Sequence, residues 1–167
     1  NMIVKVKYMD EHAAELYREA SKDIVEGGID VPFKTHEEDF CYDCVAVSCE
    51  QIAPRVYKYG LGIALQIEDE GLEFLDRKII LDIDARPRSS VYKTGMSLSN
   101  CEGTVDKIYT GQIFAVFYHL LDYLPKYEVG DKICQIKIGA TVPMEFKIVD
   151  ELTETKRGDG GFGSTGK

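Results

Sequence analysis

The segment from Asn100 to Gln112 combines a carboxylate, a tyrosine and an Asn and a Gly, residue types that could together carry chemistry. Asp106 is a carboxylate that could accept a proton from an attacking water. Tyr109 could lie flat against a sugar ring, where an additional hydroxyl would clash. Asn100 and Gly103 flank an expected hairpin, whose backbone donors and acceptors could read the edge of a base. In isolation, a hairpin with a capping Asp and a core Tyr explains the same residues equally well.

A second segment, Pro87 to Ser90, suits a polyphosphate. It follows an expected strand, and the adjacent hydroxyls of Ser89 and Ser90, with the amides of a turn, can donate several hydrogen bonds to phosphate oxygens. A plain polar turn is the alternative interpretation of this segment.

The C-terminal segment 151–167 ends in a glycine-rich stretch that begins at Arg157. Glycine loses the most backbone entropy on folding, so such a stretch does not order itself. Yet Arg157 could contact a phosphate, Phe162 could stack on a planar ring, and Ser164 and Thr165 add hydroxyls. We expect a flexible arm that closes over a nucleotide, with a disordered tail as the alternative.

The same stretch contains two misleading patterns. Gly158-x-Gly160-x-x-Gly163 matches the dinucleotide fingerprint, and the glycines before Lys167 match most of a phosphate-binding loop. Both motifs require a preceding strand and a following helix, because the helix N-terminus helps to hold the phosphates. The printed chain has no residues after Lys167 for that helix, so we reject both.

The sequence predicts mainly short strands as the elements that position these residues. Runs rich in Val, Ile, Tyr and Phe, separated by Gly, Pro, Asn or Asp, predict strands at Ile3–Tyr8, Asp43–Cys49, Arg55–Ile67, Lys78–Ala85, Gly111–His119 and Lys132–Val142. An apolar stripe predicts one helix over about Asp10–Glu26, ended by Gly27 and Gly28. We expect a mainly β domain over 1–150, a distorted jelly roll or barrel with one additional N-terminal helix.

Composition limits the class of function. The chain has 167 residues and a formal net charge of −9, and it lacks a broad basic stripe, which argues against a nucleic-acid partner. No apolar run approaches the length of a membrane span, so we expect no membrane partner either. Five cysteines without a signal peptide fit a reduced, cytoplasmic protein, or the host-cell cytoplasm or nucleus if the source is viral. Cys41 and Cys44 form a CxxC pair, but the second pair or histidines of a zinc site are missing.

Read in order, the motifs resemble one family, the homotrimeric dUTPases (deoxyuridine 5′-triphosphate nucleotidohydrolases). The resemblance is carried by Tyr42-Asp43, Pro87-Arg88-Ser89-Ser90, Gly103-Thr-Val-Asp106-x-x-Tyr109-x-Gly111, Gly130-Asp-Lys-Ile-Cys-Gln135 and Arg157-Gly-x-Gly-Gly-Phe162-Gly-Ser-Thr-Gly166. It implies a jelly-roll homotrimer that hydrolyses dUTP to dUMP and pyrophosphate, with active sites assembled from more than one subunit.

The resemblance also implies a role for each residue. Asp106 would deprotonate the water that attacks the α-phosphorus, and Tyr109 would exclude ribose. Asp43 would hold Mg²⁺ through water. The remaining substrate contacts fall into three groups. The uracil edge would be read by Asn100, Gly103, Thr104 and Val105, and the phosphate end would be bound by Arg88, Ser89, Ser90 and Gln135, with Arg88 mainly bracing the subunit contact. The arm would contribute Arg157, Phe162, Gly163, Ser164 and Thr165.

Several positions depart from the family pattern. The glycine that usually precedes Tyr42 is Cys41, and the lead-in 1–40 and the stretch 66–86 are longer than usual. A related dCTP deaminase, or a bifunctional deaminase–dUTPase, is one alternative function, but it would need a tryptophan where Tyr109 stands and a glutamate where Val116 stands. A nucleotide-binding regulatory protein without catalysis is the other alternative.

Overall fold

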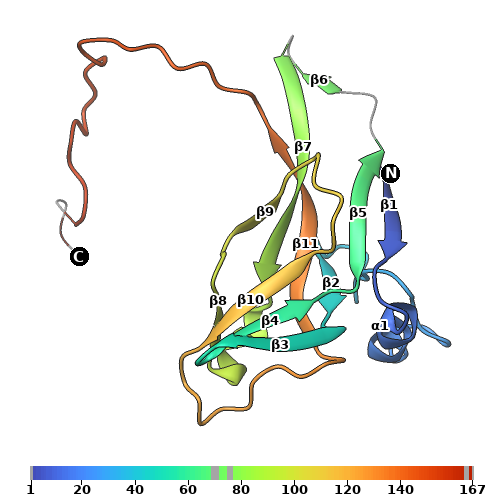
Figure 1. Cartoon of the computed structure of the whole chain (residues 1–167). Coiled ribbons are helices and arrows are strands. Elements are labelled where there is room, and N and C mark those ends of the chain that lie inside the picture. Colours follow the sequence, from blue (N-terminus) through green and yellow to red (C-terminus); the bar gives the residue numbers. More distant parts are fainter. Residues whose placement is uncertain (1, 69–71, 75–76, 164–165, 167) are drawn as a thin grey trace.

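The computed structural model describes residues 2–68, 72–74, 77–163 and 166, and its regular elements are mainly short strands (Figure 1). The elements in chain order are β1 (Ile3–Tyr8), α1 (Ala13–Ser21), β2 (Tyr42–Val45), β3 (Ser48–Ala53), β4 (Val56–Gly60), β5 (Ile63–Glu68), β6 (Leu72–Phe74), β7 (Arg77–Pro87), the 3₁₀ helix η1 (Ser89–Thr94), β8 (Met96–Leu98), β9 (Gly103–Val105), β10 (Phe114–His119) and β11 (Lys132–Thr141). No described helix is long and apolar enough to cross a membrane.

The strands form three sheets, which confirms the mainly β prediction. One sheet pairs β1 with β5, a second has the order β3-β4-β10-β8, and the third has the order β2-β11-β7-β6 with β9 on β7. Among the described strands, the ladders stay open and do not close into a barrel, so the jelly-roll part of the prediction describes the fold better than the barrel part.

Several predicted elements differ from the structure in their extent. The expected strand 55–67 is two strands, because the chain turns at Gly62, whose φ is +71°. The helix expected over 10–26 is limited to Ala13–Ser21. It ends there because the Ser21 hydroxyl donates to the Tyr17 carbonyl at 2.8 Å and accepts from the Ile29 N–H at 2.6 Å, which turns the chain back.

The expected hairpin between Asn100 and Gln112 is wrong. β9 pairs with β7, with Ala85 opposite Gly103 and Ile83 opposite Val105, whereas β10 pairs with β4 and β8. The segment therefore crosses from one sheet to another, and this crossing leaves its backbone groups available beside a cavity.

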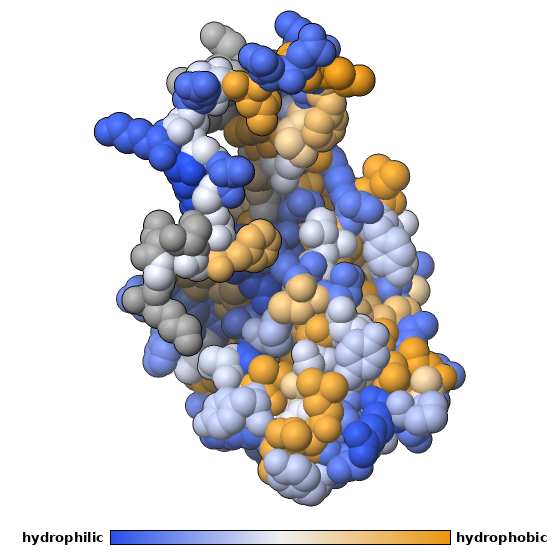
Figure 2. Space-filling model, turned by 90° about the vertical axis from the view of Figure 1, so that its left-hand side faces the viewer, coloured by the Kyte–Doolittle hydropathy of each residue, from blue (hydrophilic) through white to orange (hydrophobic). Residues whose placement is uncertain are grey.

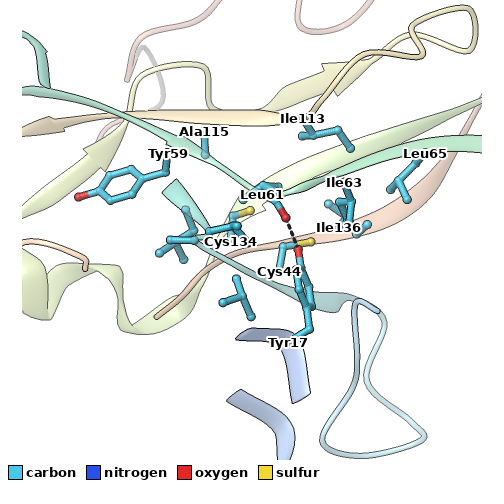
Figure 3. Close-up of a cluster of buried hydrophobic side chains, with 14 of the residues drawn as sticks. Tyr17, Cys44, Tyr59, Leu61, Ile63, Leu65, Ile113, Ala115, Cys134 and Ile136 are labelled. Atoms are coloured by element: carbon cyan, nitrogen blue, oxygen red, sulfur yellow. Dashed lines mark hydrogen bonds between the residues drawn. The ribbon is translucent and has the colours of Figure 1, made fainter. Parts of the chain in front are cut away.

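One apolar core joins the helix to the sheets (Figure 3). Tyr17 of α1 is fully buried, and its hydroxyl donates to the carbonyl of Leu61 at 2.9 Å. Cys44 and Cys134 lie opposite each other on β2 and β11 and are also fully buried. The contact with the Cys134 thiol and burial raise the pKa of Cys44, which is a thiol of the apolar core.

The chain leaves the body after β11 and runs outward as an extended arm (Figure 1). Figure 2 views the molecule from the side on which this arm lies, with a hollowed surface behind it. Apolar side chains alternate along its first part and face solvent, with Met144 77%, Phe146 87% and Ile148 98% exposed. This segment, 142–149, thus carries a strand-like apolar stripe that the described part of its own chain does not cover.

Candidate active site

The crossing segment forms one wall of a cavity of about 320 Å³, which we call the Asp106 pocket. The predicted base-reading and catalytic residues all line it. They are Asn100, Gly103, Thr104, Val105, Asp106 and Tyr109, joined by Gln112, Phe114 and Val116 among others. The structure therefore brings the predicted site residues of the third motif to one place.

Hydrogen bonds within the segment fix the position of Tyr109 relative to Asp106. The Tyr109 N–H donates to the Asp106 carbonyl at 2.9 Å, and the Tyr109 hydroxyl donates to the Gln112 carbonyl at 2.6 Å. A Cβ at Gly111 would lie 2.8 Å from the Tyr109 hydroxyl oxygen and 2.9 Å from its Cζ. Only glycine at position 111 lets the tyrosine ring lie against this turn without shifting.

The opposite end of the segment is held against β7. The Arg86 Nη2 lies 3.0 Å from Glu102 Oε2, and the Gly103 backbone pairs with Ala85. A Cβ at Gly103 would lie 3.0 Å from the Asn100 carbonyl oxygen, so Asn100 and Gly103 are in close contact. These contacts give the pocket a fixed backbone edge, which suits recognition of a planar base by hydrogen bonds.

Gln112 is a site residue that sequence reasoning did not single out. Its Oε1 accepts the Gly62 N–H at 3.1 Å, and a Cβ at Gly60 would lie 2.6 Å from the same oxygen. Gln112 therefore ties the crossing segment to the β4–β5 connection. The glycines at positions 60 and 62 were the signal in the sequence that a side chain approaches the backbone there.

The residues predicted for the phosphate end line a second cavity of about 470 Å³, which we call the Asp43 pocket. Asp43, Arg88, Ser89 and Gln135 all line it. Arg88 Nε donates to Asp43 Oδ1 at 2.9 Å, and Gln135 Nε2 donates to the Pro87 carbonyl at 3.2 Å. Ser90 lies beside this group, with its hydroxyl 3.4 Å from Arg88 Nη1. The first, second and fourth motifs thus meet in one place.

The two pockets lie on opposite faces of the third sheet. Cys134 lines the Asp106 pocket and Gln135 lines the Asp43 pocket, although they are neighbours on β11. Successive side chains of a strand point to opposite faces, so the sheet itself separates the two groups of residues. A single chain therefore presents two separate pockets, not one continuous site.

The arm residues lie at neither pocket. Phe162 is fully exposed, and the Arg157 Nε donates to the carbonyl of Gly160 on the arm itself at 2.7 Å. Gly163 follows with a φ of +83°, a conformation that favours glycine. Ser164 and Thr165 lie outside the described residues.

The described residues contain no cluster of three metal-ligating side chains. Asp43 is the single carboxylate among the predicted site residues of its pocket, and Arg88 already occupies Oδ1. Such a donor set does not fit a dedicated protein cage for a metal. It fits Mg²⁺, which keeps several waters and commonly binds through one or two carboxylates and the phosphates of a substrate.

Comparison with known proteins identifies one family. A family model described as dUTPase matches residues 80–166. The deoxyuridine 5′-triphosphate nucleotidohydrolase of Clostridium novyi (strain NT) is 35% identical over 81% of this chain and 90% of its own length. The protein of the same name from Picosynechococcus sp. is 30% identical over the same shares.

Solved structures support the same fold. The dUTPase of Staphylococcus bacteriophage 80alpha, described with dUPNHPP, aligns with a TM-score of 0.70 over 99% of both chains, at 19% identity. A mutant dUTPase from phage phi11 of S. aureus, whose description names a structural Mg(II) ion, aligns with a TM-score of 0.61 over 91% of this chain and 99% of its own, at 18% identity.

Proposed function

Because the chain belongs to the dUTPase family, we propose that it hydrolyses dUTP to dUMP and pyrophosphate. The observation that carries the proposal is the Asp106 pocket, which places a carboxylate, a tyrosine ring and a fixed backbone edge around one cavity of nucleotide size.

Asp106 is the proposed general base. Water attacks the α-phosphorus, its proton passes to the Asp106 carboxylate, and the bond from the α-phosphorus to the bridging oxygen breaks, so that pyrophosphate leaves. Asp106 is exposed in the single chain, which leaves room for the substrate and its attacking water.

Substrate selection belongs to the other walls of the Asp106 pocket. Asn100 and the backbone of 103–105 would pair with the uracil edge, so a base with different donors would leave buried polar groups unpaired. Tyr109, braced through its hydroxyl on Gln112, would exclude a 2′-hydroxyl. Val116 lines the same pocket and cannot transfer a proton, which argues against a deaminase.

The Asp43 pocket would receive the phosphate end of a nucleotide. Ser89, Ser90 and Gln135 would donate to phosphate oxygens, and Arg88 would brace Asp43. Mg²⁺ held through water by Asp43 would offset the negative charge of the triphosphate.

A homotrimer would join the two pockets. Since the sheet separates the pockets within one chain, we infer that the Asp43 pocket of one copy faces the Asp106 pocket of another. The uncovered apolar stripe 142–149 supports this arrangement, because a second copy would bury it. The arm would then bring Phe162 over the uracil, Arg157 to the γ-phosphate, and Gly163, Ser164 and Thr165 around the nucleotide.

Pyrophosphate release in the presence of Mg²⁺ tests the function. We expect rapid turnover of dUTP and far slower turnover of dCTP, UTP and dTTP. Comparable rates for dCTP would contradict the uracil-reading role of the pocket, and no turnover of dUTP would favour the non-catalytic alternative. Light scattering of the same sample tests the trimer, which a monomer would contradict.

A further inference from the structure

The segment between β1–α1 and β2 closes into a loop beside Asp43. The Phe33 N–H donates to the Asp43 carbonyl at 3.3 Å, and the Asp43 N–H donates to the Phe33 carbonyl at 2.7 Å. Phe33 is 2% exposed and belongs to the core. The base of the loop 34–42 is therefore anchored to the core and to the strand that carries Asp43.

The loop is also braced from within. The His36 N–H donates to Asp39 Oδ2 at 3.0 Å, and the Asp39 N–H donates to the His36 carbonyl at 3.1 Å. Lys34 Nζ donates to the Glu37 carbonyl at 2.6 Å and lies 5.1 Å from the centre of the Tyr42 ring. These contacts hold the loop in one shape before any ligand arrives.

Lys34, Thr35 and His36 line the Asp43 pocket together with Ser89 and Gln135. None of these three loop residues belongs to the motifs that carry the family resemblance. The loop thus adds a wall of hydrogen-bond donors to a pocket whose other side carries the predicted phosphate contacts.

The charges of the pocket favour an anion at Lys34. Arg88 is neutralised by Asp43, whereas Lys34 forms no ion pair with any carboxylate among the described residues. Asp39 also lines the pocket, and its Oδ2 accepts the His36 N–H. Lys34 therefore supplies a positive charge that an incoming phosphate can meet directly.

We propose that the loop 34–40 is a recognition element for the part of the triphosphate beyond the α-phosphorus, with Lys34 as its cation and Thr35 and His36 as additional donors. The inference rests on the proposed function. Asp106 must reach the α-phosphorus, so a pocket on the opposite face of the sheet, supplied by another copy, meets the β- and γ-phosphates that leave as pyrophosphate.

The test compares the binding of inorganic pyrophosphate and of dUMP, each with Mg²⁺, by titration calorimetry. We expect Lys34→Gln to weaken pyrophosphate binding by about tenfold or more, because a hydrogen bond to a charged group is lost, and to leave dUMP binding nearly unchanged. Lys22→Gln, on the exposed surface after α1, is the matched control and should bind both ligands as the parent protein does.

The His36→Ala variant tests whether weaker binding in Lys34→Gln comes only from distortion of the loop. The bonds that brace His36 in the loop come from its backbone, so removal of the imidazole leaves them in place. We expect this variant to weaken pyrophosphate binding several-fold, again without an effect on dUMP.

Two results would overturn the inference. One is unchanged pyrophosphate affinity in both variants. The other is weaker pyrophosphate binding in Lys34→Gln with no change in His36→Ala, because loss of the Lys34 bond to the Glu37 carbonyl would then explain the effect by loop distortion alone. The parent protein is assayed for dUTP hydrolysis in parallel, so a failure of the proposed function is seen separately.

Discussion

At the scale of single residues, the crossing segment 100–112 is held by contacts that its neighbours make possible. Gly103 lets Asn100 approach, Gly111 lets the Tyr109 ring lie against the turn, and Gln112 accepts from Gly62. These glycines allow neighbouring polar groups to approach the backbone closely, and they do not mark a flexible loop. The proposed chemistry depends on this fixed arrangement, because a general base acts only within hydrogen-bond reach of its proton.

Replacement of Asp106 by Asn removes the proposed proton acceptor while keeping the side-chain shape. General-base catalysis commonly contributes roughly 10²–10⁴-fold, so we expect a loss of about 10³-fold in kcat. Binding of a non-hydrolysable dUTP analogue should change little. The rate of pyrophosphate release is the measurement, and undiminished turnover would exclude the proposed role of Asp106.

Gly111→Ala should move the Tyr109 ring, because the new Cβ would lie within 3 Å of two atoms of that side chain. We expect the ratio of kcat/KM for dUTP over UTP to fall by about tenfold or more, since the ring no longer blocks the 2′-hydroxyl. The ratio is measured with both nucleotides under identical Mg²⁺. If it stays at the parent value, Tyr109 does not act as the sugar gate.

At the scale of elements, the outer face of β7 and β11 carries a group of charges beside the proposed catalytic residue. Asp82 and Asp84 lie on this face, and Lys137 Nζ lies 3.5 Å from Asp84 Oδ2. A Cβ at Gly139 would lie 2.2 Å from Asp82 Oδ1 and 2.6 Å from Asp84 Oδ2, so glycine in β11 makes room for the two carboxylates. Burial raises the pKa of Asp82, with further contributions from Asp84 and Asp106.

This raised pKa gives a prediction about stability. The folded state binds the Asp82 proton more tightly than the unfolded state does, so stability falls as pH rises through the raised pKa. At pH 7 the ionised Asp82 carboxylate is therefore a net cost, and Asp82→Asn should raise Tm by a few degrees.

The gain from Asp82→Asn should shrink as the pH is lowered toward the raised pKa, where Asp82 is already neutral. Thermal unfolding at pH 7 and at acidic pH measures both. Asp23→Asn, an exposed carboxylate, is the control and should show neither effect. A gain that is independent of pH would show that charge repulsion is not the cause.

At the scale of the whole molecule, the proposed function would require assembly, because the two proposed parts of the site lie apart in one chain. The Asp106 and Asp43 pockets lie on opposite faces of one sheet, and the described residues of the arm line neither pocket. The arm itself runs outward from the body (Figure 1). In this arrangement, each active site would take its base pocket, its phosphate pocket and its covering arm from more than one copy of the chain.

Removal of 157–167 separates the two proposed tasks of the C-terminal segment. We expect the truncated protein to remain a trimer and to lose about 10²-fold or more in kcat/KM, because it lacks the Arg157 charge and the cover that excludes water. Removal from position 142 onward should also weaken the trimer, since it deletes the apolar stripe. Light scattering and kinetics on both truncations measure this, and a fully active first truncation would contradict the proposed role of the arm.

The sequence by itself determined the mainly β class, the positions of most strands, and the identity of the motifs. Alternation of apolar residues and turn residues is a local signal, and the residue types of Asp106, Tyr109 and Arg157 are visible without a fold. The roles assigned to those residues came from a family resemblance. The sequence did not reveal that 100–112 crosses between sheets, because strand pairing depends on distant segments.

Only the tertiary structure decided which motifs meet. It placed Asn100 through Gln112 around one pocket and Asp43, Ser89 and Gln135 around another, and it separated the two by a sheet. It also brought residues of the loop 34–40 to the Asp43 pocket, although these residues lie outside the family motifs. These facts depend on long-range pairing, above all Phe33 with Asp43 and β11 with β2 and β7, which no local pattern in the chain encodes.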